Sequence, residues 1–101
     1  MSADIVHLAE VGELDPKPTL AGPWRFIRFA RIPAGDELAL ELEHTEYLVF
    51  VVDGTGSARV GGKEVPLRRG SSLTLMAGAT ARITGGDGGA EVFVVAASTE
   101  R

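Results

Sequence analysis

Residues 41–56 of the chain read ELEHTEYLVFVVDGTG. Three glutamates and one of the two histidines precede an apolar run at 47–52. This run starts with a tyrosine and is followed by Asp53 and Gly54. The run has the β-branched and aromatic composition of a strand, and aspartate followed by glycine is typical of a turn. The stretch therefore predicts a buried strand with a solvated start. Its carboxylates and histidine also make it the first candidate for a metal or acid–base site.

The rest of the chain repeats this pattern of short apolar segments. We expect further strands at 24–32, 38–43, 57–60, 63–67, 72–76, 79–83 and 90–97. No segment has the 3.6-residue apolar period of a helix. The glycine-rich segment 85–89 predicts a flexible hairpin loop. So many short strands, separated by turn signals at intervals of roughly 8–12 residues, predict an all-β sandwich or barrel.

The length of 101 residues fits one domain. Residues 1–22 mix charges with Pro16, Pro18 and Gly22, so we expect an irregular N-terminal arm with at most one short strand, around Ile5 to Leu8. The folded domain is then expected to span 23–101.

Composition narrows the class of partner and the compartment. Cysteine is absent and the net charge is −4, with no basic stripe to neutralise a nucleic-acid backbone. The N-terminal residues lack the pattern of a signal peptide, and no apolar run is long enough to cross a membrane. We therefore expect a soluble, cytoplasmic protein that binds neither nucleic acid nor membrane.

Two strands are apolar on both faces, namely 47–52 (YLVFVV) and 92–97 (VFVVAA). A strand with one face in water alternates apolar and polar residues, so each of these strands needs two covers. One cover is the interior of the barrel. The second is expected to be another subunit, which predicts a homodimer.

Two sequence blocks resemble the motifs of the cupin superfamily, and the resemblance extends over about residues 24–97. The first family motif, HxHxxxExxxxxxG, ends at Gly54, which aligns its two histidines with Glu41 and Glu43 and its glutamate with Tyr47. The resemblance implies a cupin-like double-stranded β-helix barrel, a form of jelly roll.

The second family motif, GxxxxxPxGxxHxxxN, starts at Gly70. Its proline, second glycine and histidine align with Met76, Gly78 and Ala81. The turn glycines of both motifs are thus kept while all four ligand positions differ. Cupin metals are held by three imidazoles and a carboxylate, so the resemblance predicts a cupin without the usual metal cofactor.

His44 lies one residue out of the motif register. Because strand residues alternate between faces, it is expected opposite Glu43 unless a bulge intervenes. With such a bulge, a noncanonical metal site of His44, Glu46 and Glu43 is an alternative.

The facing of the strand around Glu41 is left open by the sequence. If Glu41 and Glu43 point inward, they form a buried carboxylate pair beside Tyr47 that can act as base and acid, with the phenol as donor. If Leu38, Leu40 and Leu42 point inward instead, the glutamates are solvated. These alternatives decide whether Glu41, Glu43 and Tyr47 are catalytic.

A ligand site is expected near the entrance of the barrel. Trp24, Phe26 and Met76 are its candidate apolar lining. Arg28 or Arg59, if one faces inward, implies an anionic small-molecule ligand or substrate.

The first functional hypothesis is a metal-independent, cupin-like enzyme that moves protons in an isomerase, cyclase, dehydratase or lyase reaction. The second is a non-catalytic cupin module that binds or senses a small molecule. The third is a metalloenzyme with a site around His44.

Overall fold

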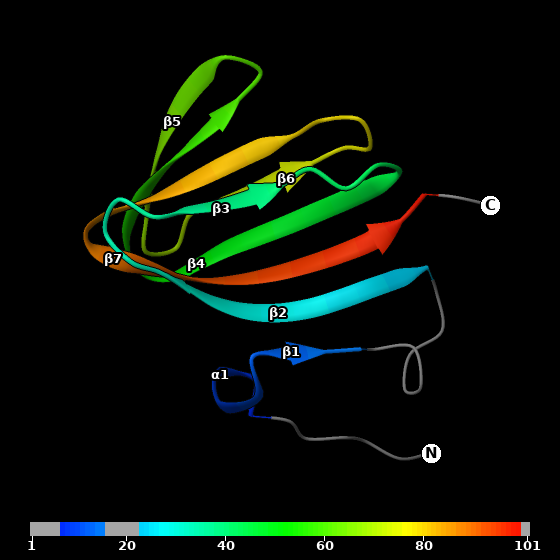
Figure 1. Cartoon of the computed structure of the whole chain (residues 1–101), viewed down its shortest axis with the longest axis horizontal. Helices are drawn as coiled ribbons and strands as arrows, with labels where there is room; N and C mark the ends of the chain where they lie inside the picture. The colour runs from blue at the N-terminus through cyan, green and yellow to red at the C-terminus, as the bar shows by residue number, and fades with distance from the viewer. Residues whose placement is uncertain (1–6, 16–22, 100–101) are drawn as a thin grey trace.

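The computed structural model describes residues 7–15 and 23–99, which form one seven-stranded sheet folded into a barrel (Figure 1). Its elements are α1 (Leu8–Val11), β1 (Glu13–Leu14), β2 (Trp24–Ile32), β3 (Glu37–Leu40), β4 (Thr45–Val60), β5 (Lys63–Arg68), β6 (Ser72–Leu75) and β7 (Ala81–Ser98). All strand pairs are antiparallel. The predicted all-β class is confirmed.

Two long strands, β4 and β7, build the barrel because each bends and takes part in two layers (Figure 1). The second half of β7 pairs with β2, and the first half of β4 pairs with β6. These segments and β1 form what we call the β2 layer. The first half of β7 pairs with β3, and the second half of β4 pairs with β5. They form the β3 layer.

Two segments that were expected to be turns or loops are bends inside these long strands. Gly54 pairs with Ala90 and Gly56 pairs with Gly85, with register shifts between them. A Cβ at Gly54 would overlap the carbonyl oxygen of Gly89, so the backbones approach too closely for any side chain. The predicted flexible hairpin at 85–89 is therefore wrong. Glycines in strand interiors mark bends and close backbone contacts, and here they let both strands pass from one layer to the other.

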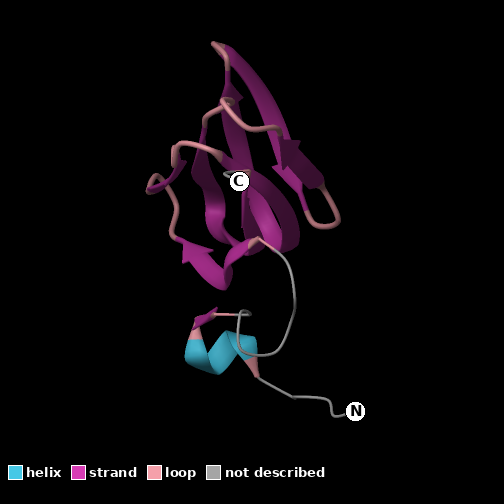
Figure 2. Ribbon diagram, turned by 90° about the vertical axis from the view of Figure 1, so that its right-hand side faces the viewer, coloured by secondary structure: helices cyan, strands magenta, loops and turns pink. Residues whose placement is uncertain are grey.

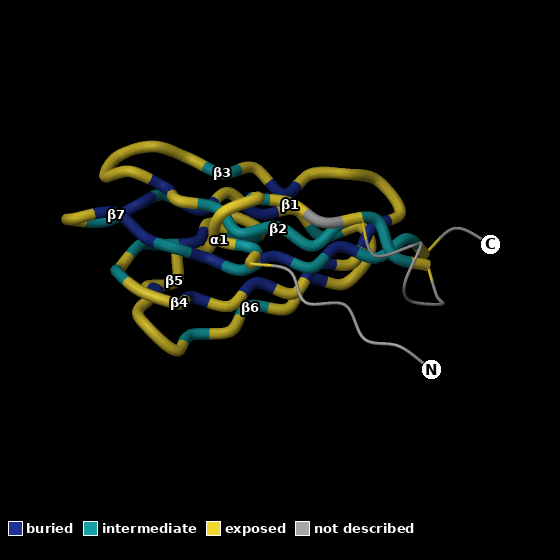
Figure 3. The backbone as a smooth tube through the Cα atoms, turned by 90° about the horizontal axis from the view of Figure 1, so that it is seen from below, coloured by how far each residue is buried: buried dark blue, intermediate teal, exposed yellow. Residues whose placement is uncertain are grey.

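The interior is filled by apolar side chains from the facing sides of both layers. Buried and exposed residues alternate along β4 from Thr45 to Val52 (Figure 3). The buried apolar core consists of Ile32, Leu40, Tyr47, Val49, Val51, Ala58, Leu67, Leu75, Ala81, Ile83, Ala90, Val92, Val94 and Ala96.

The described part of the N-terminal segment lies outside the barrel beside β2 (Figure 2). Glu13 pairs with Arg28 across the β1 and β2 strands, and their side chains form an ion pair of 2.8 Å. Leu8 begins the short helix α1, so the strand expected there is wrong at this residue, while Ile5 lies outside the described residues. Within 7–15 and 23–99, no helix is long and apolar enough to span a membrane.

Candidate functional site

The strand that carries the first motif changes its inward face at a turn. Leu40 is buried in β3, whereas Thr45 and Tyr47 are buried in β4. Between them the chain turns at Glu43 and His44, and His44 has a φ of 53°. Histidine tolerates this left-handed conformation better than most non-glycine residues. The turn shifts the alternation by one residue, so even-numbered residues face inward before it and odd-numbered residues face inward after it.

Glu41 and Glu43 therefore do not form an inward carboxylate pair, and that expectation is wrong. Both are exposed. Glu41 accepts a hydrogen bond of 2.9 Å from Nε of Arg82, which lies on the outer face of the β3 layer. The solvated alternative holds for the glutamates, although only Leu38 and Leu40 of the three leucines turn inward. Leu42 is 51% exposed because it lies at the turn.

Tyr47 faces inward, as the motif register predicted, and is 3% exposed. Its hydroxyl oxygen accepts a hydrogen bond of 3.1 Å from the backbone N–H of Leu42. Thr45 donates a second bond, 2.9 Å long, to the carbonyl oxygen of Glu43. Both side chains thus hold the turn that reverses the alternation. The phenol has a partner in the backbone, and neither motif glutamate lies beside it in the interior.

A hollow of about 420 Å³ lies at the start of β4, on the outer side of the β2 layer. A β-bulge between Trp24 and Phe26 turns Trp24 and Ile27 to the same side of β2. The strand register then sets these two beside residues of β7, β4 and the end of β6. The apolar lining consists of Trp24, Ile27, Leu48, Leu75, Met76, Val95 and Ala97.

The polar groups in this hollow belong to Glu46 and Thr74. Tyr47 lies at its border, and the indole of Trp24 adds an N–H. The structure thus brings Trp24, Met76, Tyr47 and Glu46 together, although they were predicted for three different roles. Sequence reasoning missed Leu48 and Val95. Their signal was present in the two segments that are apolar on both faces.

The remaining predicted ligand residues lie elsewhere. Phe26 packs against the core on the inner side of β2, and the guanidinium of Arg28 lies 4.5 Å from the centre of its ring. Arg28 is also paired with Glu13. Arg59 is exposed and pairs with Arg82 in the strand register, on the outer side of the β3 layer. These two arginines therefore do not meet at one site.

No protein-family model matches the sequence, and no curated protein matches it. The chain is similar to the solved structure of a Cupin 2 conserved barrel domain protein from Salinispora arenicola. The TM-score is 0.80 and the identity 16%, over 97% of this chain and 91% of that chain. This chain has the cupin fold.

Two further solved structures support the cupin assignment. A cupin protein from Bacteroides fragilis matches with a TM-score of 0.75 and 16% identity, over 97% of this chain and 83% of that one. A predicted oxalate decarboxylase from Thermotoga maritima matches with a TM-score of 0.68 and 20% identity, over 75% of this chain and 68% of that one. The fold predicted from the glycines at positions 54 and 70 is confirmed.

The usual cupin metal does not fit the residues at its motif positions. Glu41 and Glu43 lie outside the barrel, Tyr47 is bonded to the backbone, and Ala81 has no donor atom. Within the described residues, no group of three or more histidine, aspartate or glutamate side chains is arranged to hold an ion. His44 and Glu46 therefore lack a third ligand of these types there, and we derive no chemistry through a metal.

Proposed function

We propose that this cupin is a non-catalytic module that binds a small apolar molecule in the hollow between Trp24 and Met76. The observation that carries the proposal is the lining of the hollow, in which seven apolar residues border a space with one carboxylate, Glu46. Its volume of about 420 Å³ lies in the range of roughly 300–1,000 Å³ typical of small-molecule sites.

The lining indicates the chemistry of the ligand. Removing apolar surface from water contributes roughly 25 cal/mol per Å², so an alkyl or aromatic body is the main source of affinity. An ionised glutamate only accepts hydrogen bonds, so Glu46 favours a ligand with an amine or another donor at one end. An anionic ligand gains no support here because Arg28 and Arg59 lie away from the hollow.

The enzyme hypothesis is less well supported by the geometry. It assigned proton transfer to Glu41 or Glu43 and stabilisation of negative charge to Tyr47 and an arginine. A general base must reach its proton directly or through one water. Both glutamates are solvated outside the barrel, while Tyr47 is buried in it.

Fluorescence tests the binding proposal directly because Trp24 is the one tryptophan of the chain. Octylamine, octanol and octanoate have equal chain lengths and differ in charge, so they serve as probes. We expect all three to shift the Trp24 emission, with octylamine binding about threefold tighter than octanol and octanoate weaker than either.

Two variants locate the site. Glu46→Gln should remove the preference for the amine and leave octanol binding unchanged, whereas Glu64→Gln, on the other layer, should change neither. Met76→Ala should weaken all three probes. Emission that none of the probes alters, or an octanoate affinity above that of octylamine, would refute the proposal.

A further inference from the structure

An exposed apolar stripe runs along the outer side of β4. Leu48, Phe50 and Val52 are 42%, 43% and 41% exposed, while the residues between them are buried. These are large side chains at consecutive outward positions of one strand. A stripe of this kind is unusual on a surface that faces water, where outward strand residues are mostly polar.

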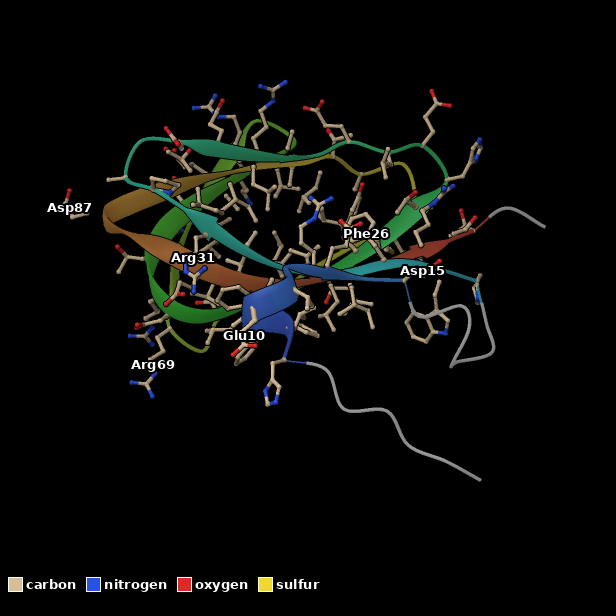
Figure 4. All side chains as sticks on the ribbon, turned by 60° about the horizontal axis from the view of Figure 1, so that its bottom comes forward. Glu10, Asp15, Phe26, Arg31, Arg69 and Asp87 are labelled. Atoms are coloured by element: carbon tan, nitrogen blue, oxygen red, sulfur yellow. The ribbon has the colours of Figure 1, made fainter. Side chains whose placement is uncertain are left out.

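The stripe continues across neighbouring strands. The register aligns Leu48 with Val95 of β7 and Ile27 of β2, and it aligns Phe50 with Phe93 and Phe29. These four side chains are partly exposed. We call this surface, with Leu48, Phe50 and Val52, the apolar face. Its charged border includes the Arg31–Glu91 pair, 3.1 Å apart, at the end of β2 next to the bend of β7 (Figure 4).

The outer side of the β3 layer is different in composition. Arg82 pairs there with Glu41 at 2.9 Å and with Glu37 at 3.6 Å. Arg59 and Glu64 lie opposite each other on the neighbouring strands β4 and β5. Only the β2 layer therefore has an outer side whose burial removes a large apolar surface from water. Association through this side alone gives a closed pair of subunits and not an open chain.

The apolar face has the size of the central part of an interface between copies. Its residues lie on the three neighbouring strands β2, β7 and β4, which are spaced roughly 4.8 Å apart; over roughly seven residues of about 3.3 Å they make a face of about 330 Å² in projection. Side-chain relief raises the accessible area above this projection. A face of this size can form the apolar centre of a standard interface, in which each partner buries roughly 800 Å² including a polar rim.

We propose that the apolar face binds the same face of a second copy of the chain, which gives a closed two-fold dimer. The charge pattern supports this occupant. The chain has a net charge of −4, so two copies repel each other, but the centre of the apolar face is uncharged and the Arg31–Glu91 pair on its border is neutral. A face of this kind is self-complementary, since apolar side chains meet apolar side chains under a two-fold axis. The dimer needs no ligand, but Ile27, Leu48 and Val95 belong to the apolar face and also line the hollow, so a partner subunit and a bound ligand would compete for these side chains.

Light scattering coupled to size-exclusion chromatography measures the mass over a hundredfold range of protein concentration. We expect twice the chain mass at the upper end, and a thermal midpoint that rises with concentration because association stabilises only the folded state. A monomer at every concentration, with a constant midpoint, would overturn the proposal. A larger or open-ended assembly would overturn it as well.

A matched pair of variants identifies the face. Val52 and Val65 are 41% and 40% exposed, but Val65 lies in β5 of the other layer. Val52→Lys should give a folded monomer, while Val65→Lys should remain a dimer. Phe50→Ser, which adds no charge, is a second test at the centre, and circular dichroism monitors folding in each case. Dimers that persist in both folded apolar-face variants would contradict the assignment, as would a Val65→Lys monomer.

Discussion

The two halves of β4 share one inner side and differ in their outer sides. In the first half the outward residues after Glu46 are Leu48, Phe50 and Val52, whereas in the second half they include Ser57 and Arg59. The inward residues, such as Val49 and Ala58, are buried in both halves. A single strand thus has a largely apolar outer side in one layer and a polar outer side in the next. The difference indicates that the inward residues determine the packing of the barrel, while the outward residues determine whether the outer side of each layer is apolar or polar.

The bend between the halves should be the most sensitive point. Gly54→Ala combines a φ of 84° with an overlap against backbone atoms that cannot move aside, so we expect a loss of at least about 3 kcal/mol in unfolding free energy. Urea denaturation followed by circular dichroism measures it. Gly88→Ala is the control, because its φ is 80° but nothing lies within 4 Å, and about 1 kcal/mol is expected. Equal losses would show that conformation alone matters.

The facing of the inner side is tested by two leucines separated by one residue. Leu40 is 1% exposed and Leu42 is 51% exposed. Leu40→Ala should cost about 2–5 kcal/mol through lost burial and the cavity it leaves. Leu42→Ala should change stability by no more than about 0.5 kcal/mol. Comparable losses at both positions would mean that the strand does not stop alternating at the turn.

The turn that reverses the alternation depends on Tyr47. Tyr47→Phe keeps the ring and removes the acceptor for the Leu42 N–H, so about 1 kcal/mol of stability should be lost. Thermal unfolding measures this loss. The same variant should leave the binding of the octyl probes unchanged, since the hydroxyl is engaged with the backbone. A large effect on probe binding and none on stability would return the phenol to a functional role.

The charged outer side of the β3 layer should contribute least. Arg82→Gln removes two exposed ion pairs, for which we expect no more than about 1 kcal/mol, and less at high salt. Arg59→Gln, where the described residues include no ion pair, is the control. Stability curves at low and high salt distinguish the two variants. A loss that salt does not reduce would indicate packing rather than charge.

Much of the fold was predictable because strand composition is a local property. The strands at 24–32, 63–67 and 72–76 are found within one residue of their expected bounds. The two long strands were not predicted as continuous. Glycine in a short window signals a turn, and only the opposite strand shows that Gly54 and Gly56 are bend positions packed against Gly89, Ala90 and Thr84.

The candidate site was predictable only in part. Trp24 and Met76 were identified as ligand residues, but they were expected at the entrance of the barrel rather than on the outer side of a layer. The bulge beside Trp24 and the position of Met76 after β6 set their direction. Neither feature leaves a clear sequence signal. The inward facing considered for Glu41 and Glu43 is not found for a related reason, since the motif register assumed one continuous alternation.

Residue types alone account for the all-β class, the two strands apolar on both faces and the loss of imidazoles from the ligand positions. Tertiary structure alone decided which side of each strand is inner. An alternating strand can place either its odd-numbered or its even-numbered residues inward, and the choice depends on strands that are distant in the sequence. Here the left-handed conformation of His44 lets β3 place its even-numbered residues inward and lets β4 place its odd-numbered residues inward, from Thr45 to Val51. The glutamates that drew attention to this stretch are solvated as a result, while Tyr47 is buried.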